Sequence, residues 1–176
     1  MNTFKYIDGS LHCEGVDLSV LEEKHGTPSY VYSKKTIEEN AKAYVNSFTN
    51  SRNLACFAVK SLSNLSILKI IKDAGCGFDI VSGGELHRVL SIGAEPKKII
   101  FSGVGKTKNE IQQGINSGIL SFNVESESEL YRIEKIADDI ESPAPISIRI
   151  NPDIDSGGHD YITTGRKGDK FGISDT

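Results

Sequence analysis

Lys60 is the residue whose type and position point most directly to chemistry, because it ends a mostly apolar run over residues 54–59. Such a run is typical of a strand buried on both faces, and the amphipathic segment that begins at Asn64 and covers residues 65–73 is typical of a helix. Parallel α/β folds hold their catalytic groups at the carboxyl ends of such strands. Half-burial there lowers the pKa of an amine, and only a neutral amine attacks a carbonyl, so Lys60 is a candidate Schiff-base lysine. The alternative is a lysine that extends from the strand end into water.

The same pattern of an apolar segment with a polar end repeats along the chain. Strand-like segments begin near residues 54, 76, 98, 119 and 145, about one βα unit apart, which is typical of parallel α/β folds. Their polar ends are Lys60, Asp79, Ser102, Asn123, and Arg149 with Asn151. We therefore expect an α/β fold that forms a partial (β/α)8 barrel with a polar mouth. An open doubly wound sheet is the alternative, but it would bind ligands only at a switch point.

Helix boundaries are marked in the sequence as well. Residues 82–85, 107–110 and 126–129 fit the capping box, in which a serine or threonine is followed three residues later by a glutamate. Before the repeating part, residues 3–13 predict a hairpin, residues 16–25 a short helix and residues 29–32 a strand. Ser33 is the predicted cap of the next helix.

Three charged residues of the predicted mouth each have two interpretations. Asp79, in a strand predicted to be buried, needs a partner, which is either the amine of Lys60 or, in a purely structural role, the turn at Ser82. Glu85 completes a capping box, and from one turn into its helix it also faces the mouth. Arg149 offers its planar fork to an oxygen anion, or it forms a structural salt bridge with Asp79 or Glu85.

Other candidates rest on position alone. Ser102 and Asn123 are possible active-site residues because they end their strands at the same edge. His159 is a further candidate, in a Gly-, Asp- and Thr-rich loop over residues 151–165, and loops of this length after a barrel strand are often lids.

Composition and motifs argue against several other classes. Gly-Lys-Thr follows a strand at residues 105–107, but the P-loop pattern needs a glycine where Ile100 stands. The net charge of −4 and the lack of a basic stripe give no electrostatic case for nucleic acid. Cys13, Cys56 and Cys76 are in no metal-ligand spacing, so no metal is expected, and they suit a reducing cytosol. Without a membrane-length apolar run or a signal peptide, we expect a cytoplasmic protein with no membrane partner.

The number of repeating units is smaller than a closed barrel needs. Five strands of this rhythm occur in 176 residues, whereas a (β/α)8 barrel has eight units and typically about 250 residues. We therefore expect the chain to be the front part of a larger protein.

Residues 57–64, Phe-Ala-Val-Lys-Ser-Leu-Ser-Asn, resemble the lysine motif of the fold-type III pyridoxal-phosphate-dependent decarboxylases. Serine at position 61 replaces the commoner alanine of that motif, a mild change. Further segments that resemble this family follow at its spacing: residues 77–86, 101–107, 122–126 and 149–153. With His159, residues 161–165 and residues 170–173, the chain is similar to the diaminopimelate decarboxylase branch more than to the ornithine and arginine decarboxylases.

This resemblance implies an alanine-racemase-like barrel that binds pyridoxal 5′-phosphate through Lys60, with Asp79 and Glu85 beside it and Arg149 near the phenolic oxygen of the cofactor. It implies decarboxylation of meso-2,6-diaminopimelate to L-lysine in a homodimer. Residues 1–28 would then belong to a second, β-rich domain, and residues 29–176 to the first part of the barrel.

The family's stacking histidine, glycine-rich phosphate loop, pyridine-pairing glutamate and catalytic cysteine all fall after residue 176. We therefore expect the isolated chain to be inactive. The alternatives are a non-catalytic chain that binds a full-length subunit, a carrier of pyridoxal phosphate, and an enzyme for an ornithine- or arginine-type substrate.

Overall fold

The computed structural model describes residues 3–47, 53–154, 157, 164 and 171–174 of the chain. At the N-terminal end, β1 (Phe4–Ile7) and β2 (Ser10–Cys13) form the predicted antiparallel hairpin. The expected helix begins two residues later than predicted, because Val16 and Asp17 pair with β2 as β3 (Val16–Asp17). Asp17 then caps α1 (Leu18–His25) by accepting the Ser19 N–H at 2.9 Å.

The helix α2 (Lys34–Asn46) is joined to this hairpin through its first turn. Ser33 caps α2 as predicted, because its hydroxyl oxygen accepts the Thr36 N–H at 3.0 Å. One carboxylate oxygen of Glu14 accepts both the Ser33 hydroxyl at 2.6 Å and the Lys35 N–H at 2.8 Å. These bonds lower the pKa of Glu14, with the Ser33 hydroxyl as the largest cause.

The predicted strand over residues 29–32 is wrong. These residues form neither helix nor strand, and Tyr30 is 91 % exposed. A strand needs a neighbour for its backbone hydrogen bonds, and none of the described strands pairs with this segment.

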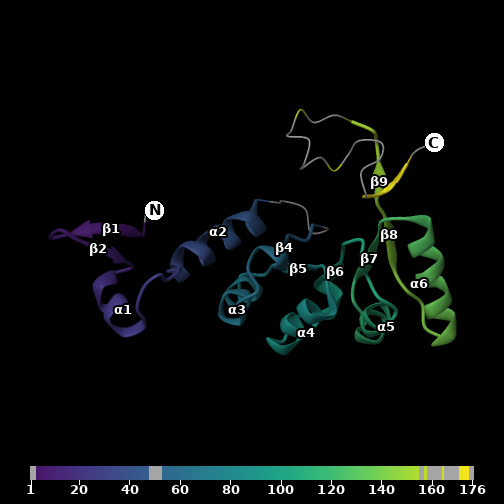
Figure 1. The fold of residues 1–176 in the computed structure, drawn as a ribbon, viewed down its shortest axis with the longest axis horizontal. Helices are drawn as coiled ribbons and strands as arrows, with labels where there is room; N and C mark the ends of the chain where they lie inside the picture. The colour runs from purple at the N-terminus through teal and green to yellow at the C-terminus, as the bar shows by residue number, and fades with distance from the viewer. Residues whose placement is uncertain (1–2, 48–52, 155–156, 158–163, 165–170, 175–176) are drawn as a thin grey trace.

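The repeating part of the chain forms one parallel sheet, as Figure 1 shows. Its strands follow one another in chain order, and every neighbouring pair is parallel. They are β4 (Cys56–Ala58), β5 (Gly77–Ile80), β6 (Ile99–Phe101), β7 (Ser121–Val124) and β8 (Ile146–Ile148). The fold is therefore α/β, and among the described residues the sheet stays open, with β4 and β8 as its two edges.

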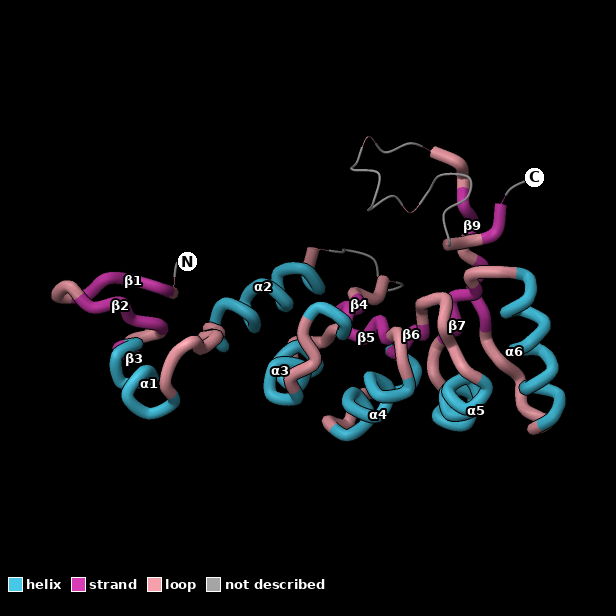
Figure 2. The backbone as a smooth tube through the Cα atoms, viewed as in Figure 1, coloured by secondary structure: helices cyan, strands magenta, loops and turns pink. Residues whose placement is uncertain are grey.

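The connecting helices all cover the same face of this sheet (Figure 2). They are α3 (Leu65–Asp73), α4 (Gly83–Ser91), α5 (Lys108–Ser117) and α6 (Glu127–Asp139), with short 3-10 turns η1 (Val59–Ser61) and η2 (Pro96–Lys98). This arrangement confirms the predicted partial (β/α) barrel, in which each strand returns through one helix.

The core lies between the sheet and these helices, because alternate residues of a strand point to opposite faces. Six strand residues are 0–1 % exposed: Phe78, Ile80, Ile99, Phe101, Phe122 and Val124. They pack with the apolar residues of α3–α6 in a single cluster. The residues between them, such as Asp79, Ser102 and Asn123, are small or polar and only partly buried. The prediction that the strand within residues 54–59 is buried on both faces is wrong, because all three residues of β4 are only partly buried.

The three predicted capping boxes differ in the structure. Thr107 and Glu110 form the complete box at the start of α5. Ser82 and Ser126 each accept the expected backbone N–H, but the partner glutamate of each reaches one residue further back. Glu85 accepts the Val81 N–H at 2.7 Å, and Glu129 accepts the Glu125 N–H at 2.7 Å.

Glu110 also joins α5 to the first residue of α4. One of its carboxylate oxygens accepts the Gly83 N–H at 2.7 Å, and the other accepts the Thr107 N–H at 2.9 Å. The bond from Gly83 is the largest of the causes that lower the pKa of Glu110.

The substitution Glu110→Gln leaves one acceptor oxygen for two backbone N–H groups, so we expect it to lower the free energy of unfolding at pH 7 by about 1–2 kcal/mol. Because the folded-state pKa is lowered, this stabilisation is present above the unfolded pKa of about 4.3 and is lost as the pH falls through the folded value. Urea unfolding at pH 7 and at lower pH measures it. The gap between wild type and variant should shrink with acid, and an equal gap at both pH values would contradict this account. Glu134→Gln, an exposed position on α6, is the control.

Candidate active site

The polar groups collect at the carboxyl edge of the sheet, as predicted, but Lys60 is placed differently from the expectation. The strand β4 ends at Ala58, and Lys60 lies in η1, where the neighbouring Val59 is fully buried and Lys60 itself is exposed. Half-burial of Lys60 is therefore wrong for this chain. Val59 fixes the turn in the core, and the amine is presented to solvent from the strand end.

Asp79, Ser102 and Asn123 form a hydrogen-bonded row across three neighbouring strands. The Ser102 hydroxyl donates to Asp79 Oδ1 at 2.5 Å, and the Asn123 Nδ2 donates to Ser102 Oγ at 2.8 Å. The structure thus brings together three of the predicted site residues, on the face of the sheet that the helices leave uncovered. The expected partner of Asp79 is wrong in both interpretations, because its described bond goes to Ser102 and to neither Lys60 nor the turn at Ser82.

Glu85 lies one turn into α4, and its carboxylate points back to the sheet. It accepts the N–H of Val81, the residue that follows β5. It therefore lies at the carboxyl edge, and its role as a residue that faces the mouth stays a prediction.

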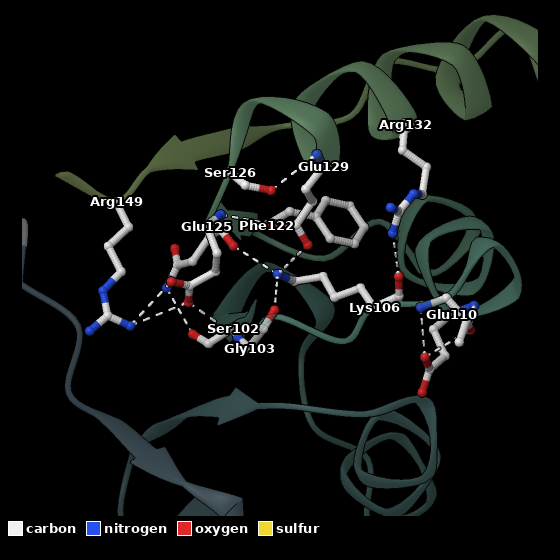
Figure 3. Close-up of polar contacts among 12 residues, drawn as sticks. Ser102, Gly103, Lys106, Glu110, Phe122, Glu125, Ser126, Glu129, Arg132 and Arg149 are labelled. Atoms are coloured by element: carbon white, nitrogen blue, oxygen red, sulfur yellow. Dashed lines mark hydrogen bonds and ion pairs between the residues drawn. The ribbon is translucent and has the colours of Figure 1, made fainter. Parts of the chain in front are cut away.

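Arg149 lies between β8 and β9 (Ile150–Asn151), and its partner is Glu125. Arg149 Nη1 donates to the two carboxylate oxygens of Glu125 at 3.2 and 3.3 Å. The Glu125 side chain is 3 % exposed and that of Arg149 is 39 % exposed, so the guanidinium reaches from the buried carboxylate to the open side (Figure 3). The predicted salt bridge with Asp79 or Glu85 is wrong.

Phe171 holds the guanidinium from a second direction. The Arg149 Cζ lies 4.7 Å from the centroid of the Phe171 ring, a cation–π distance. The next residues form β10 (Ile173–Ser174), which pairs in parallel with β9, and Asn151 Nδ2 donates to the Phe171 carbonyl at 3.2 Å. A Cβ on Gly172 would lie 3.1 Å from the Arg149 carbonyl oxygen, and its φ is +78°, so glycine suits this close crossing. His159 lies outside the described residues.

Lys106 is the main feature of this region that the sequence did not reveal. Its ammonium is fully buried, and it donates to the Gly103 carbonyl at 2.7 Å, the Asn123 carbonyl at 2.8 Å and Glu129 Oε1 at 2.9 Å. In the sequence it appears only as the lysine of a rejected P-loop, and Glu129 appears only as a capping residue. The sequence gives only a weak indication that Glu125 belongs to the site, because it is a carboxylate directly after a buried strand.

No group of three or more His, Cys, Asp and Glu side chains in the described part of the chain is placed to hold a metal ion. Within the same residues, no helix has the length and apolar character that crossing a membrane requires.

A parallel sheet with helices on one face and polar side chains at its carboxyl edge defines the class as an α/β protein with a partial (β/α) barrel. Residues 34–176 match the family described as "Pyridoxal-dependent decarboxylase, pyridoxal binding domain". The chain belongs to this family.

Individual relatives agree with the family match. The chain is 48 % identical over 174 residues to the diaminopimelate decarboxylase of Pseudomonas aeruginosa and 49 % identical over 175 residues to that of Vibrio cholerae. Each alignment covers 99 % of this chain and 42 % of the relative, so the chain spans less than half the length of these proteins.

Solved structures show the same fold. A crystal structure of diaminopimelate decarboxylase from Helicobacter pylori complexed with L-lysine matches with a TM-score of 0.85 at 44 % identity, over 90 % of this chain and 40 % of that one. A diaminopimelate decarboxylase from M. jannaschii matches with a TM-score of 0.89 at 38 % identity, over 98 % of this chain and 41 % of that one. The resemblance seen in the sequence is thereby confirmed at the level of family and fold.

The buried pair of Lys106 and Glu129 gives a stability prediction. Lys106→Met leaves the Glu129 carboxylate buried without a cation, and we expect the free energy of unfolding to fall by about 3–5 kcal/mol. The control is Lys108→Met, because Lys108 and its partner Asp139 lie 3.5 Å apart with side chains 66 % and 48 % exposed. Breaking that surface pair should cost less than about 1 kcal/mol. Urea unfolding measures the loss of unfolding free energy in each variant. Equal losses in the two variants would contradict the buried pairing of Lys106 with Glu129.

Cys56 gives a prediction on reactivity. Its thiol lies on β4, and burial is the largest of the causes that raise its pKa to about 11, ahead of the nearby Asp79. Because the thiolate is the nucleophile, the alkylation rate of Cys56 should rise about tenfold per pH unit between pH 8 and 10. Mass spectrometry of iodoacetamide-treated protein measures this rate, with glutathione as the reference thiol. A plateau of the Cys56 rate near pH 9 would show an ordinary thiol.

Proposed function

We propose that this chain is the lysine-bearing, pyridoxal-phosphate-binding part of a decarboxylase that converts meso-2,6-diaminopimelate to L-lysine and CO₂. The observation that carries the proposal is the exposed amine of Lys60, which follows β4 at the edge where Asp79, Ser102, Asn123 and Arg149 also lie. The names of the relatives support this choice of substrate over an ornithine- or arginine-type amino acid.

The side chains of this edge fit pyridoxal phosphate by their chemistry. The cofactor's aldehyde requires a primary amine, and Lys60 presents one that makes no described hydrogen bond or ion pair. Its phenolic oxygen suits a cationic donor, and Arg149 is anchored to Glu125 through Nη1, which leaves other guanidinium N–H groups for such an oxygen. When bound, this cofactor supplies an electron sink for the pair left behind as CO₂ departs.

The residues of this chain would act mainly by holding and orienting. Lys60 would hold the cofactor through its amine. The row of Asp79, Ser102 and Asn123 would keep the uncovered face of the sheet polar, and Glu85 would support the turn after β5. The proposed domain boundary lies between residues 28 and 29, and the proposed assembly is a cytoplasmic homodimer.

The isolated chain is proposed to lack catalytic turnover. The sheet is open at β4 and β8 within the described residues, and Ile146 and Ile148 of the edge strand are 41 % and 51 % exposed. An uncovered mouth admits water to the reacting groups, whereas a closed active site excludes water and prevents side reactions. The same exposed edge favours a second role, in which the chain binds a full-length subunit.

The test is an absorbance titration of the chain with pyridoxal phosphate, followed by borohydride reduction and peptide mapping. We expect a red-shifted band and a pyridoxyl label on Lys60, and Lys60→Ala should lose both. The control is Lys69→Ala, because Lys69 is an exposed lysine of α3 paired with Asp73 at 3.0 Å. Labels spread evenly over surface lysines would count against the proposal. A label on Lys60 without CO₂ release from diaminopimelate is the result expected of the isolated chain.

A further inference from the structure

The buried ammonium of Lys106 has no place in the function proposed so far. Lysine is almost never fully buried unless it is paired, and here all three of its N–H donors have acceptors on separate parts of the fold: the loop after β6, the end of β7 and the first turn of α6. We propose that Lys106 is a positioning residue for Arg149, acting through Glu129 and Glu125. This inference rests on the proposed function, in which Arg149 contacts the cofactor.

Two arms lead from Lys106 to the carboxylate that holds Arg149, as Figure 3 shows. In the first arm, Lys106 binds Glu129 Oε1 at 2.9 Å, and Glu129 Oε2 accepts the Glu125 N–H at 2.7 Å, which orients the Glu125 backbone. In the second arm, Lys106 binds the Gly103 carbonyl at 2.7 Å, and the Gly103 N–H donates to Glu125 Oε1 at 3.4 Å. Both arms therefore converge on Glu125.

Positive and negative groups alternate from Lys106 through the two glutamates to Arg149, so each buried carboxylate has one cation. Glu125 and Glu129 are two buried carboxylates four residues apart, with side chains 3 % and 6 % exposed. Lys106 neutralises one and Arg149 the other. Without Lys106, two buried negative charges would share one guanidinium, and buried like charges oppose each other strongly. Arg149 would then lose its single, defined partner.

Among the residues that the structure describes, no other cation is placed to do this task. Arg132, the nearest described arginine on α6, is exposed and donates from Nη1 to the Lys106 backbone carbonyl at 3.3 Å, so it supports the loop and faces neither carboxylate in a described bond. Lys106 Nζ also lies 5.8 Å from the ring centroid of the buried Phe101, a cation–π distance. The geometry thus gives Lys106 one position and one carboxylate partner.

The test compares Lys106→Met with the double variant Lys106→Met/Glu129→Gln. In the double variant the introduced amide still offers an oxygen to the Glu125 N–H, and the surplus buried charge is gone. The readout is the rate at which phenylglyoxal modifies Arg149, followed by mass spectrometry, with Arg88 in the same digest as the internal reference. This readout needs no cofactor, so a chain that fails to bind pyridoxal phosphate defeats the proposed function without deciding this inference.

We expect Lys106→Met to raise the Arg149 rate about tenfold or more, the factor that corresponds to losing a hydrogen bond to a charged group, while the Arg88 rate stays within about twofold. The double variant should return the Arg149 rate close to that of wild type. Where pyridoxal phosphate binds, its apparent affinity should fall in Lys106→Met and recover in the double variant.

An unchanged Arg149 rate in a folded Lys106→Met protein overturns the proposal, and so does a folded double variant with Arg149 unprotected. If Lys106→Met unfolds, phenylglyoxal modifies Arg88 and Arg149 at similar rates. The Arg149 rate in the folded double variant then tests the proposal by itself. A purely structural lysine would give no recovery on removal of the second charge.

Discussion

The structure depends on one constraint: a parallel sheet whose helices cover a single face. Alternate residues of each strand must be apolar to fill that covered face, which is why Phe78, Phe101 and Phe122 point to it and are almost fully buried. The residues on the other face are free to be polar, and Ser102, which follows β6, bonds both to Asp79 of β5 and to Asn123 of β7. The hydrogen-bonded row of Asp79, Ser102 and Asn123 therefore follows from the way the core is built.

Buried charge is the second organising element, and it is concentrated where the strands end. Lys106, Glu129, Glu125 and Arg149 form an alternating series that begins in the core and ends with a partly exposed guanidinium. Desolvating these groups is costly, and breaking one pair leaves an uncompensated charge. Such a series gives little net stability over an apolar core, but it defines one arrangement of the loops after β6 and β7.

The sequence predicted the elements well because their signals are local. Capping residues at Ser33, Asn64 and Thr107, together with the alternation of apolar residues, marked most helices and the order of the strands. The strand over residues 29–32 failed because a strand exists only beside a neighbour. The predicted partners of the site residues were wrong for a related reason. The pairing of Arg149 with Glu125 depends on how two strand ends meet in space, which residue spacing does not indicate. Lys106 resembles any polar loop residue until the fold surrounds it.

The short pairing of β9 with β10 has a consequence for how this protein can vary. Ile150 and Ile173 lie side by side, so the chain leaves and rejoins the same point beside Arg149. This pairing carries Phe171 to the Arg149 guanidinium, and Gly172 joins Phe171 to β10 with a φ of +78°. A side chain at position 172 would therefore disturb the arginine although it lies in another part of the sequence.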